Sequence, residues 1–82
     1  MFYVYILQCE HGFLYTGYTS SLSERITEHF SGKGCRFTKS NKPLKLVYYE
    51  KHSTQKSAMK REISIKKMKR EEKLELASRF SL

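Results

Sequence analysis

The amino-terminal segment restricts the fold more than any other part of the sequence. Residues 2–8 and 13–19 are rich in β-branched and aromatic side chains, and Glu10-His11-Gly12 between them is typical of a turn. The pattern predicts a β-hairpin. A three-residue turn would pair position 5 with 17 and position 7 with 15, so Tyr5 and Tyr15 would be diagonal neighbours on one face of the sheet. By itself, a tyrosine pair in a hairpin is more often packing than a functional site.

A helix and a polar loop are expected after the hairpin. Ser21 and Glu24 have the spacing of a capping box at a helix start. The apolar residues of this helix recur every four positions, at Leu22, Ile26 and Phe30. Residues 31–43, which hold two glycines and end at a proline, are predicted to form a polar loop.

The second half of the chain predicts one strand and two helices. Residues 44–50 have strand composition, Ser53 or Thr54 caps a helix that runs to about Lys67, and a last helix spans residues 70–79. The apolar residues at helical spacing in this last helix are Leu74, Ala77 and Phe80. The expected class is α/β (α+β), a three-stranded, mainly antiparallel sheet flanked by helices in the order β-β-α-β-α-α.

Length and composition exclude several classes of protein. The 82 residues suffice for one core, so a single domain over residues 1–82 is expected. There is no run of eighteen apolar residues and no signal-peptide pattern, which favours a cytoplasmic protein that does not span a membrane. Cys9 and Cys35 lack the spacing of a zinc site and are expected to be reduced thiols.

Positive charge is concentrated in the second half of the chain. Sixteen Lys and Arg against eight Asp and Glu give +8, and residues 42–82 hold twelve of the bases and five of the acids, which is +7. Such a field attracts polyanions, and phosphate backbones fit better than a bilayer because few large apolar groups lie beside the bases. The alternative is a charged surface that only keeps the protein soluble.

Arg25 and His29 border the apolar stripe of the first helix. At about 100° per residue they lie side by side at one edge of that stripe. Taken alone, they fit an arginine whose stem covers the core and a half-buried histidine, with Glu24 and Glu28 able to neutralise them.

Glu62 is an anomaly on the second long helix. It falls inside the apolar arc formed by Ala58, Met59, Ile63 and Ile65, where an unpaired carboxylate is costly. Lys66, four residues on, could be its ion-pair partner. A magnesium site with a single protein carboxylate is the alternative, since Mg²⁺ keeps several waters and also binds substrate phosphate.

These residues together resemble the GIY-YIG nuclease superfamily. Tyr3-Val4-Tyr5 followed by Tyr15-Thr16-Gly17 is similar to its paired signature. The positions that match the family at its spacing are Tyr5, Tyr15, Arg25, His29 and Glu62. The resemblance covers nearly the whole chain and is closest to a small, stand-alone bacterial branch of predicted endonucleases, with its SGKGCRFTK-like loop and KREISIKK-like helix.

The resemblance implies a DNA endonuclease of low sequence specificity, with branched or structured DNA among its substrates and a role in DNA repair or recombination. One Mg²⁺ or Mn²⁺ would be held by Glu62, Arg25 would bind the phosphate, Tyr5 or Tyr15 would deprotonate water, and His29 would relay a proton or fix a tyrosine. Backbone phosphates would contact a set of exposed bases, Lys33, Arg36, Lys39, Lys66, Lys67, Lys69 and Arg70.

Two departures from the family pattern keep other functions open. Tyr18 stands where other branches have a lysine, and no Asn or Gln follows Glu62. An additional DNA-binding domain of the kind that targets other members of the superfamily is not expected. The alternatives are a nucleic-acid-binding module without catalysis and a subunit that takes its activity or targeting from a protein partner.

Overall fold

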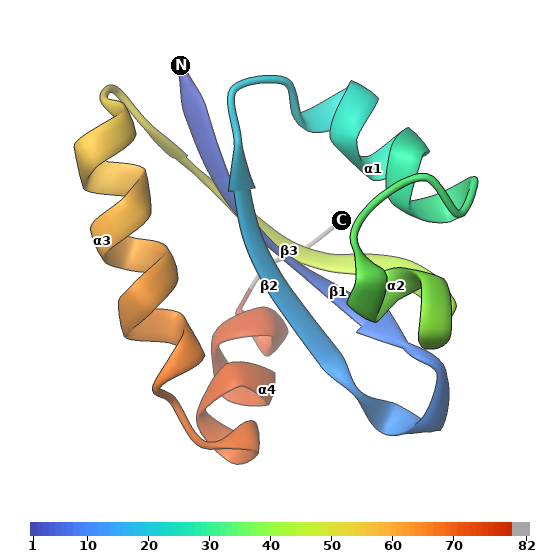
Figure 1. Cartoon of the computed structure of the whole chain (residues 1–82). Helices are drawn as coiled ribbons and strands as arrows, with labels where there is room; N and C mark the ends of the chain where they lie inside the picture. Colours follow the sequence, from blue (N-terminus) through green and yellow to red (C-terminus); the bar gives the residue numbers. More distant parts are fainter. Residues whose placement is uncertain (80–82) are drawn as a thin grey trace.

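A three-stranded antiparallel sheet forms the centre of the protein (Figure 1). The computed structural model describes residues 1–79, in which β1 (Phe2–Cys9) lies between β2 (Leu14–Thr19) and β3 (Pro43–His52). β1 pairs antiparallel with both neighbours, so β2 and β3 are the two edges of the sheet. The expected class and element order are confirmed.

The hairpin has the register that the sequence predicts. Its turn, η1 (Glu10–Gly12), holds three residues, and Cys9 N donates to Phe13 O at 2.8 Å where the strands meet it. Tyr5 lies opposite Gly17, and Leu7 lies opposite Tyr15. Because residues two apart on a strand share a face, Tyr5 and Tyr15 are on the same side of the sheet, as expected.

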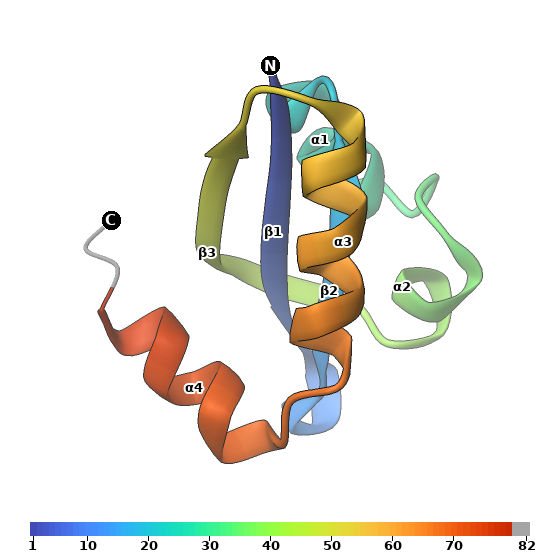
Figure 2. The ribbon, with the colours of Figure 1, turned by 90° about the vertical axis from the view of Figure 1, so that its left-hand side faces the viewer.

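Helices cover both faces of the sheet. α1 (Leu22–Phe30) and α2 (Arg36–Ser40) lie on one side, and α3 (Gln55–Lys66) and α4 (Arg70–Ser78) lie on the other (Figure 1). Figure 2 shows α3 running beside the strands and α4 turning away from them. No helix within residues 1–79 combines the length and apolar character needed to cross a membrane.

The alternating pattern of β1 produces two apolar cores. Tyr5, Leu7 and Cys9 point to one face, and they pack with residues of β2, α1, α2 and β3, namely Tyr15, Leu22, Ile26, Phe37, Leu46 and Tyr49. Val4 and Ile6 point to the other face and pack against Ala58 and Ile65 of α3. All four strand positions from Val4 to Leu7 are buried, which fixes the central position of β1.

The loop and the first helix start differ from expectation. α2 forms inside residues 31–43, where a polar loop was predicted. The capping box of Ser21 and Glu24 does not form, because Thr19 Oγ1 already accepts from Ser21 N at 3.0 Å and Ser21 makes no side-chain cap bond. Phe80, predicted on the face of the last helix, lies outside the described residues.

The long helix α3 begins where the sequence predicts. Thr54 is the N-cap residue, and its hydroxyl accepts from Ser57 N at 3.1 Å. Ala58 and Ile65 of this helix pack against the sheet. β3 is longer at both ends than the predicted strand of residues 44–50.

Candidate functional site

Tyr5 is the centre of the candidate site. Its side chain is buried and extends over Gly17 of the edge strand β2, the residue that is paired with Tyr5 in the hairpin. A Cβ at position 17 would lie 2.6 Å from Tyr5 Oη and 2.8 Å from Tyr5 Cζ. The missing side chain of Gly17 therefore makes the room that brings the Tyr5 hydroxyl to the edge of the sheet.

A buried histidine binds the Tyr5 hydroxyl. Tyr5 Oη lies 2.8 Å from His29 Nε2, and His29, expected to be half buried, is completely buried. The ring of Tyr15 lies 5.2 Å from the His29 ring and 6.3 Å from the Tyr5 ring, measured between centroids. The hairpin thus brings Tyr5 and Tyr15 into contact with the same residue of α1, His29.

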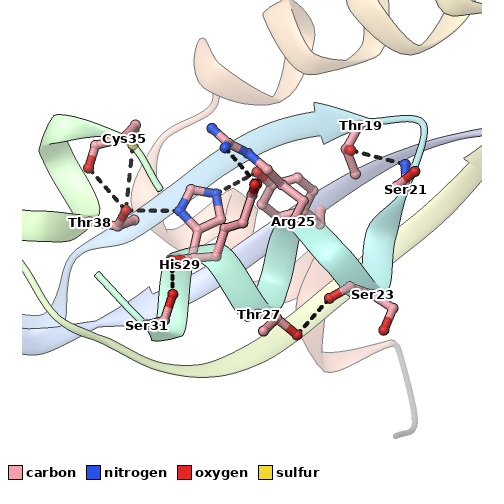
Figure 3. Close-up of polar contacts among 11 residues, drawn as sticks. Thr19, Ser21, Ser23, Arg25, Thr27, His29, Ser31, Cys35 and Thr38 are labelled. Atoms are coloured by element: carbon pink, nitrogen blue, oxygen red, sulfur yellow. Dashed lines mark hydrogen bonds and ion pairs between the residues drawn. The ribbon is translucent and has the colours of Figure 1, made fainter. Parts of the chain in front are cut away.

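Arg25 reaches the same hydroxyl from α1. Its guanidinium is near enough to lower the pKa of Tyr5, and it forms an ion pair with Glu28 at 3.1 Å (Figure 3 shows Arg25 beside His29). About a third of the Arg25 side chain is exposed, and about half of the Glu28 side chain. An exposed ion pair of this kind is weak, so Arg25 is able to exchange Glu28 for an incoming anion.

The second ring nitrogen of His29 is held by the loop that follows α1. His29 Nδ1 lies 2.8 Å from Thr38 Oγ1, and Thr38 Oγ1 lies 3.2 Å from the carbonyl oxygen of Cys35 and 3.6 Å from Cys35 Sγ (Figure 3). A Cβ at Gly34 would be 2.3 Å from His29 Nδ1. The loop therefore packs directly against the imidazole of His29, with no room for a side chain at position 34.

Burial favours the uncharged forms of Tyr5, Tyr15 and His29. It raises the pKa of Tyr5, and the charge of Glu62 adds to this rise while Arg25 opposes it. Burial also raises the pKa of Tyr15, to which a hydrogen bond with Cys35 contributes. Burial and the nearby Arg25 lower the pKa of His29 below its ordinary value of 6.5. A neutral His29 has one free lone pair, which can accept a proton.

Glu62 approaches from the other side of the edge strand. It belongs to α3, and β2 runs between α3 and the pair α1 and α2 (Figure 1). The Glu62 side chain is 17% exposed, and its ion pair with Lys66 Nζ is long, at 3.7 Å. Its negative charge adds to the rise in the pKa of Tyr5, so the carboxylate lies within electrostatic range of that tyrosine.

Glu62 is a candidate ligand for a divalent metal ion. Within residues 1–79 no group of three or more His, Cys, Asp or Glu side chains is placed to hold a metal. A single carboxylate with a long ion pair on one side and partial access to water fits Mg²⁺ or Mn²⁺, because such ions complete their shell with water and substrate phosphate.

The predicted phosphate-binding bases are all exposed, and they form two groups. Lys33, Arg36 and Lys39 lie in or next to α2, while Lys66, Lys67, Lys69 and Arg70 lie between the end of α3 and the start of α4. The two groups are on opposite sides of the sheet (Figure 1). Arg70 also donates a hydrogen bond to Gly12 O in the hairpin turn, so its guanidinium is partly engaged.

Sequence reasoning missed three residues that shape the site. Gly34, Cys35 and Thr38 surround His29, and the two glycines of the predicted loop were the only signal of a close approach there. Gly17 belongs to the signature motif of the sequence, but its contact with Tyr5 follows only from the structure.

Gly17→Ala tests how tightly the site is packed. The added methyl group would displace the rigid, buried Tyr5 ring, so we expect the free energy of unfolding to fall by about 1–3 kcal/mol. The Tyr5–His29 hydrogen bond should also be lost, as measured by the NMR signals of the His29 ring. Thr16→Ala is the control, because Thr16 lies next along β2 but pairs with Ile6, on the opposite face. An unchanged His29 environment in Gly17→Ala would contradict the role given to Gly17.

The comparisons with known proteins agree with this geometry. Residues 1–75 match the model of the GIY-YIG catalytic domain. The chain is 51% identical over 75 residues to a UPF0213 protein of Syntrophus aciditrophicus, covering 90% of this chain and 86% of the relative. It is 45% identical over 76 residues to one of Staphylococcus saprophyticus, covering 93% of each chain.

A solved structure has the same fold. The solution NMR structure of the UPF0213 protein BH0048 from Bacillus halodurans superimposes with a TM-score of 0.60 at 40% identity, covering 95% of this chain and 84% of that one. The signature tyrosines lie within the matched residues 1–75, as do Arg25, His29 and Glu62. The chain therefore belongs to the GIY-YIG nuclease family, whose domain implies a nucleic-acid substrate.

Proposed function

We propose that the protein is a divalent-metal-dependent endonuclease that hydrolyses phosphodiester bonds in DNA with low sequence specificity. The observation that carries the proposal is the hydrogen bond between Tyr5 Oη and Nε2 of the buried, neutral His29, with Arg25 on one side of the edge strand and Glu62 on the other. A general base, a phosphate-binding cation and a metal ligand would then share one small area at β2.

Arg25 and Glu62 would hold the scissile phosphate. Arg25 can exchange its exposed partner Glu28 for phosphate oxygens, which a guanidinium binds through charge-assisted, often bidentate hydrogen bonds. Glu62 would hold one Mg²⁺ or Mn²⁺, which when bound supplies positive charge against the phosphate and the leaving oxygen. Both residues would act mainly on charge that develops in the transition state.

Tyr5 and His29 would move the proton. Water attacks phosphorus and gives a proton to Tyr5 Oη, while the proton of Tyr5 passes along its 2.8 Å hydrogen bond to His29 Nε2. A new P–O bond forms, the opposite P–O bond breaks, and its electron pair stays on the leaving oxygen, which is protonated from solvent. His29 then returns its proton to solvent through Tyr5. Tyr15 contacts His29 through its ring, at 5.2 Å between centroids, and that ring would orient His29.

The basic groups would bind the DNA backbone without reading bases. We expect affinity for duplex DNA to fall steeply with salt, because each phosphate contact releases condensed counterions. Reversing Lys66, Lys67 and Lys69 to Glu should weaken binding to unrelated sequences almost equally and flatten the salt dependence. Fluorescence anisotropy at several salt concentrations measures both effects. Binding that does not depend on salt would refute this part of the proposal.

Cleavage of plasmid, linear and branched DNA tests the activity. The wild type should nick or cut at least one of these forms with Mg²⁺ or Mn²⁺, and a chelator should stop the reaction. The variant Glu24→Ala, in which an exposed glutamate of α1 outside the site is lost, should cleave like the wild type. Salt-dependent DNA binding without cleavage under all these conditions would favour a binding module that lacks catalysis.

A further inference from the structure

Thr38 has a single hydroxyl proton, and its neighbours determine where that proton points. Thr38 Oγ1 lies 3.2 Å from the Cys35 carbonyl oxygen and 2.8 Å from His29 Nδ1. A carbonyl oxygen can only accept, so the Thr38 proton is donated to Cys35 O. The short contact with His29 is then a hydrogen bond only if Nδ1 carries a proton and donates it to Thr38.

The contact at Nε2, on the other side of the imidazole, requires the same protonation state of His29. Tyr5 Oη lies 2.8 Å from His29 Nε2, and the Arg25 guanidinium near it can only donate. Tyr5 therefore donates its proton to Nε2. Nε2 can accept this hydrogen bond only when it carries no hydrogen itself. Since His29 is neutral, its single ring proton must be on Nδ1. Two separate hydrogen bonds thus select one tautomer.

We infer that Thr38 is a positioning residue that fixes His29 in the Nδ1–H tautomer and so keeps the Nε2 lone pair directed at Tyr5. The inference rests on the proposed function for its catalytic meaning, because only this tautomer lets His29 take the proton of Tyr5. Thr38 and His29 are both almost completely buried, and a Cβ at Gly34 would overlap the imidazole. Water consequently has no room to replace the hydroxyl.

NMR of the ¹⁵N-labelled histidine rings tests the tautomer without any substrate. At about pH 8, above the ordinary pKa of histidine, the wild-type His29 should show a protonated Nδ1 and an unprotonated Nε2. Thr38→Ser keeps the hydroxyl and should keep this pattern. Thr38→Val has nearly the same shape but no acceptor, and it should shift His29 towards the Nε2–H tautomer. His52, which contacts Glu50 and Ser57 instead, is the internal control and should not change.

Cleavage provides the second measurement. Thr38→Val should lower the rate by about a hundredfold, within the range that a general base contributes, with little change in DNA affinity, and Thr38→Ser should restore most of it. An Nε2–H tautomer in the wild type, or an unchanged tautomer in Thr38→Val, would overturn the inference. If Thr38→Val does not fold, the wild-type spectrum alone still decides which nitrogen is protonated. Absence of cleavage in the wild type would count against the proposed function and leave the tautomer result standing.

Discussion

Replacing Glu62 with alanine is expected to lower metal-dependent DNA cleavage by about 10²–10³-fold, the effect of removing one group that stabilises transition-state charge. DNA affinity should change little, because most of it comes from exposed lysines and arginines that the change leaves in place. The rate of nicking under single-turnover conditions, with anisotropy measured on the same DNA, separates the two effects.

The same variant should lose its response to metal. A metal that binds only the native state at ten times its Kd stabilises that state by about 1.4 kcal/mol, which raises the Tm of a domain of this size by roughly 5 °C or more. We expect Mg²⁺ or Mn²⁺ to raise the Tm of the wild type and not that of Glu62→Ala. Glu75→Ala is the matched control, since Glu75 also forms an i,i+4 ion pair, with Arg79 at 2.8 Å on α4.

Without metal, Glu62→Ala should be nearly as stable as the wild type. Lys66 is about half exposed and 3.7 Å from the carboxylate, so the ion pair contributes less than about 1 kcal/mol. A loss of several kcal/mol, together with unchanged cleavage and an unchanged metal response, would make Glu62 a structural partner of Lys66. The enzyme mechanism would then lack its metal ligand.

The sequence predicted best what depends on periodicity. The hairpin register followed from the two-residue period of the strands and a three-residue turn, which placed Tyr5 and Tyr15 on one face. Periodicity also placed Glu62 inside an apolar arc of its helix, but only Ala58 and Ile65 of that arc are buried, while Met59 and Ile63 are exposed. Periodicity could not show that the side of α3 that carries Glu62 lies next to β2, because the placement of a helix on a sheet depends on packing between distant segments.

The surroundings of His29 were not predictable from local patterns. α2 has five residues, too few for an apolar period to be visible in the sequence. The helical position of His29 predicted an edge of the apolar stripe, but its complete burial comes from the loop that folds over it at Gly34 and Thr38. The capping box failed for a similar reason, since Thr19 Oγ1 occupies the Ser21 N–H that Glu24 would have bound.

Exchanging each tyrosine for phenylalanine should reveal which one acts as the base. We expect Tyr5→Phe to lower cleavage by about 10²–10⁴-fold, the range for a general base. Tyr15→Phe keeps the ring that packs on His29 and should cost less than about tenfold. Tyr5→Phe also removes a hydroxyl that contacts the buried His29, so it should lower the free energy of unfolding by about 1–2 kcal/mol, whereas Tyr15→Phe, at a partly buried residue, should lower it less.

The pH dependence of cleavage distinguishes the proton relay from a packing effect. His29 must be unprotonated to accept the proton of Tyr5, and burial lowers its pKa below 6.5. The rate of wild-type cleavage should therefore be at its maximum above the lowered pKa of His29 and should fall as the pH decreases through that pKa. The residual cleavage of Tyr5→Phe should not depend on pH in that range, because the relay is already broken, whereas Tyr15→Phe should follow the wild-type profile. If Tyr15→Phe were the variant that lost both the rate and the acidic limb, the base would be Tyr15, and the Tyr5–His29 hydrogen bond would serve only to pack the hairpin against α1.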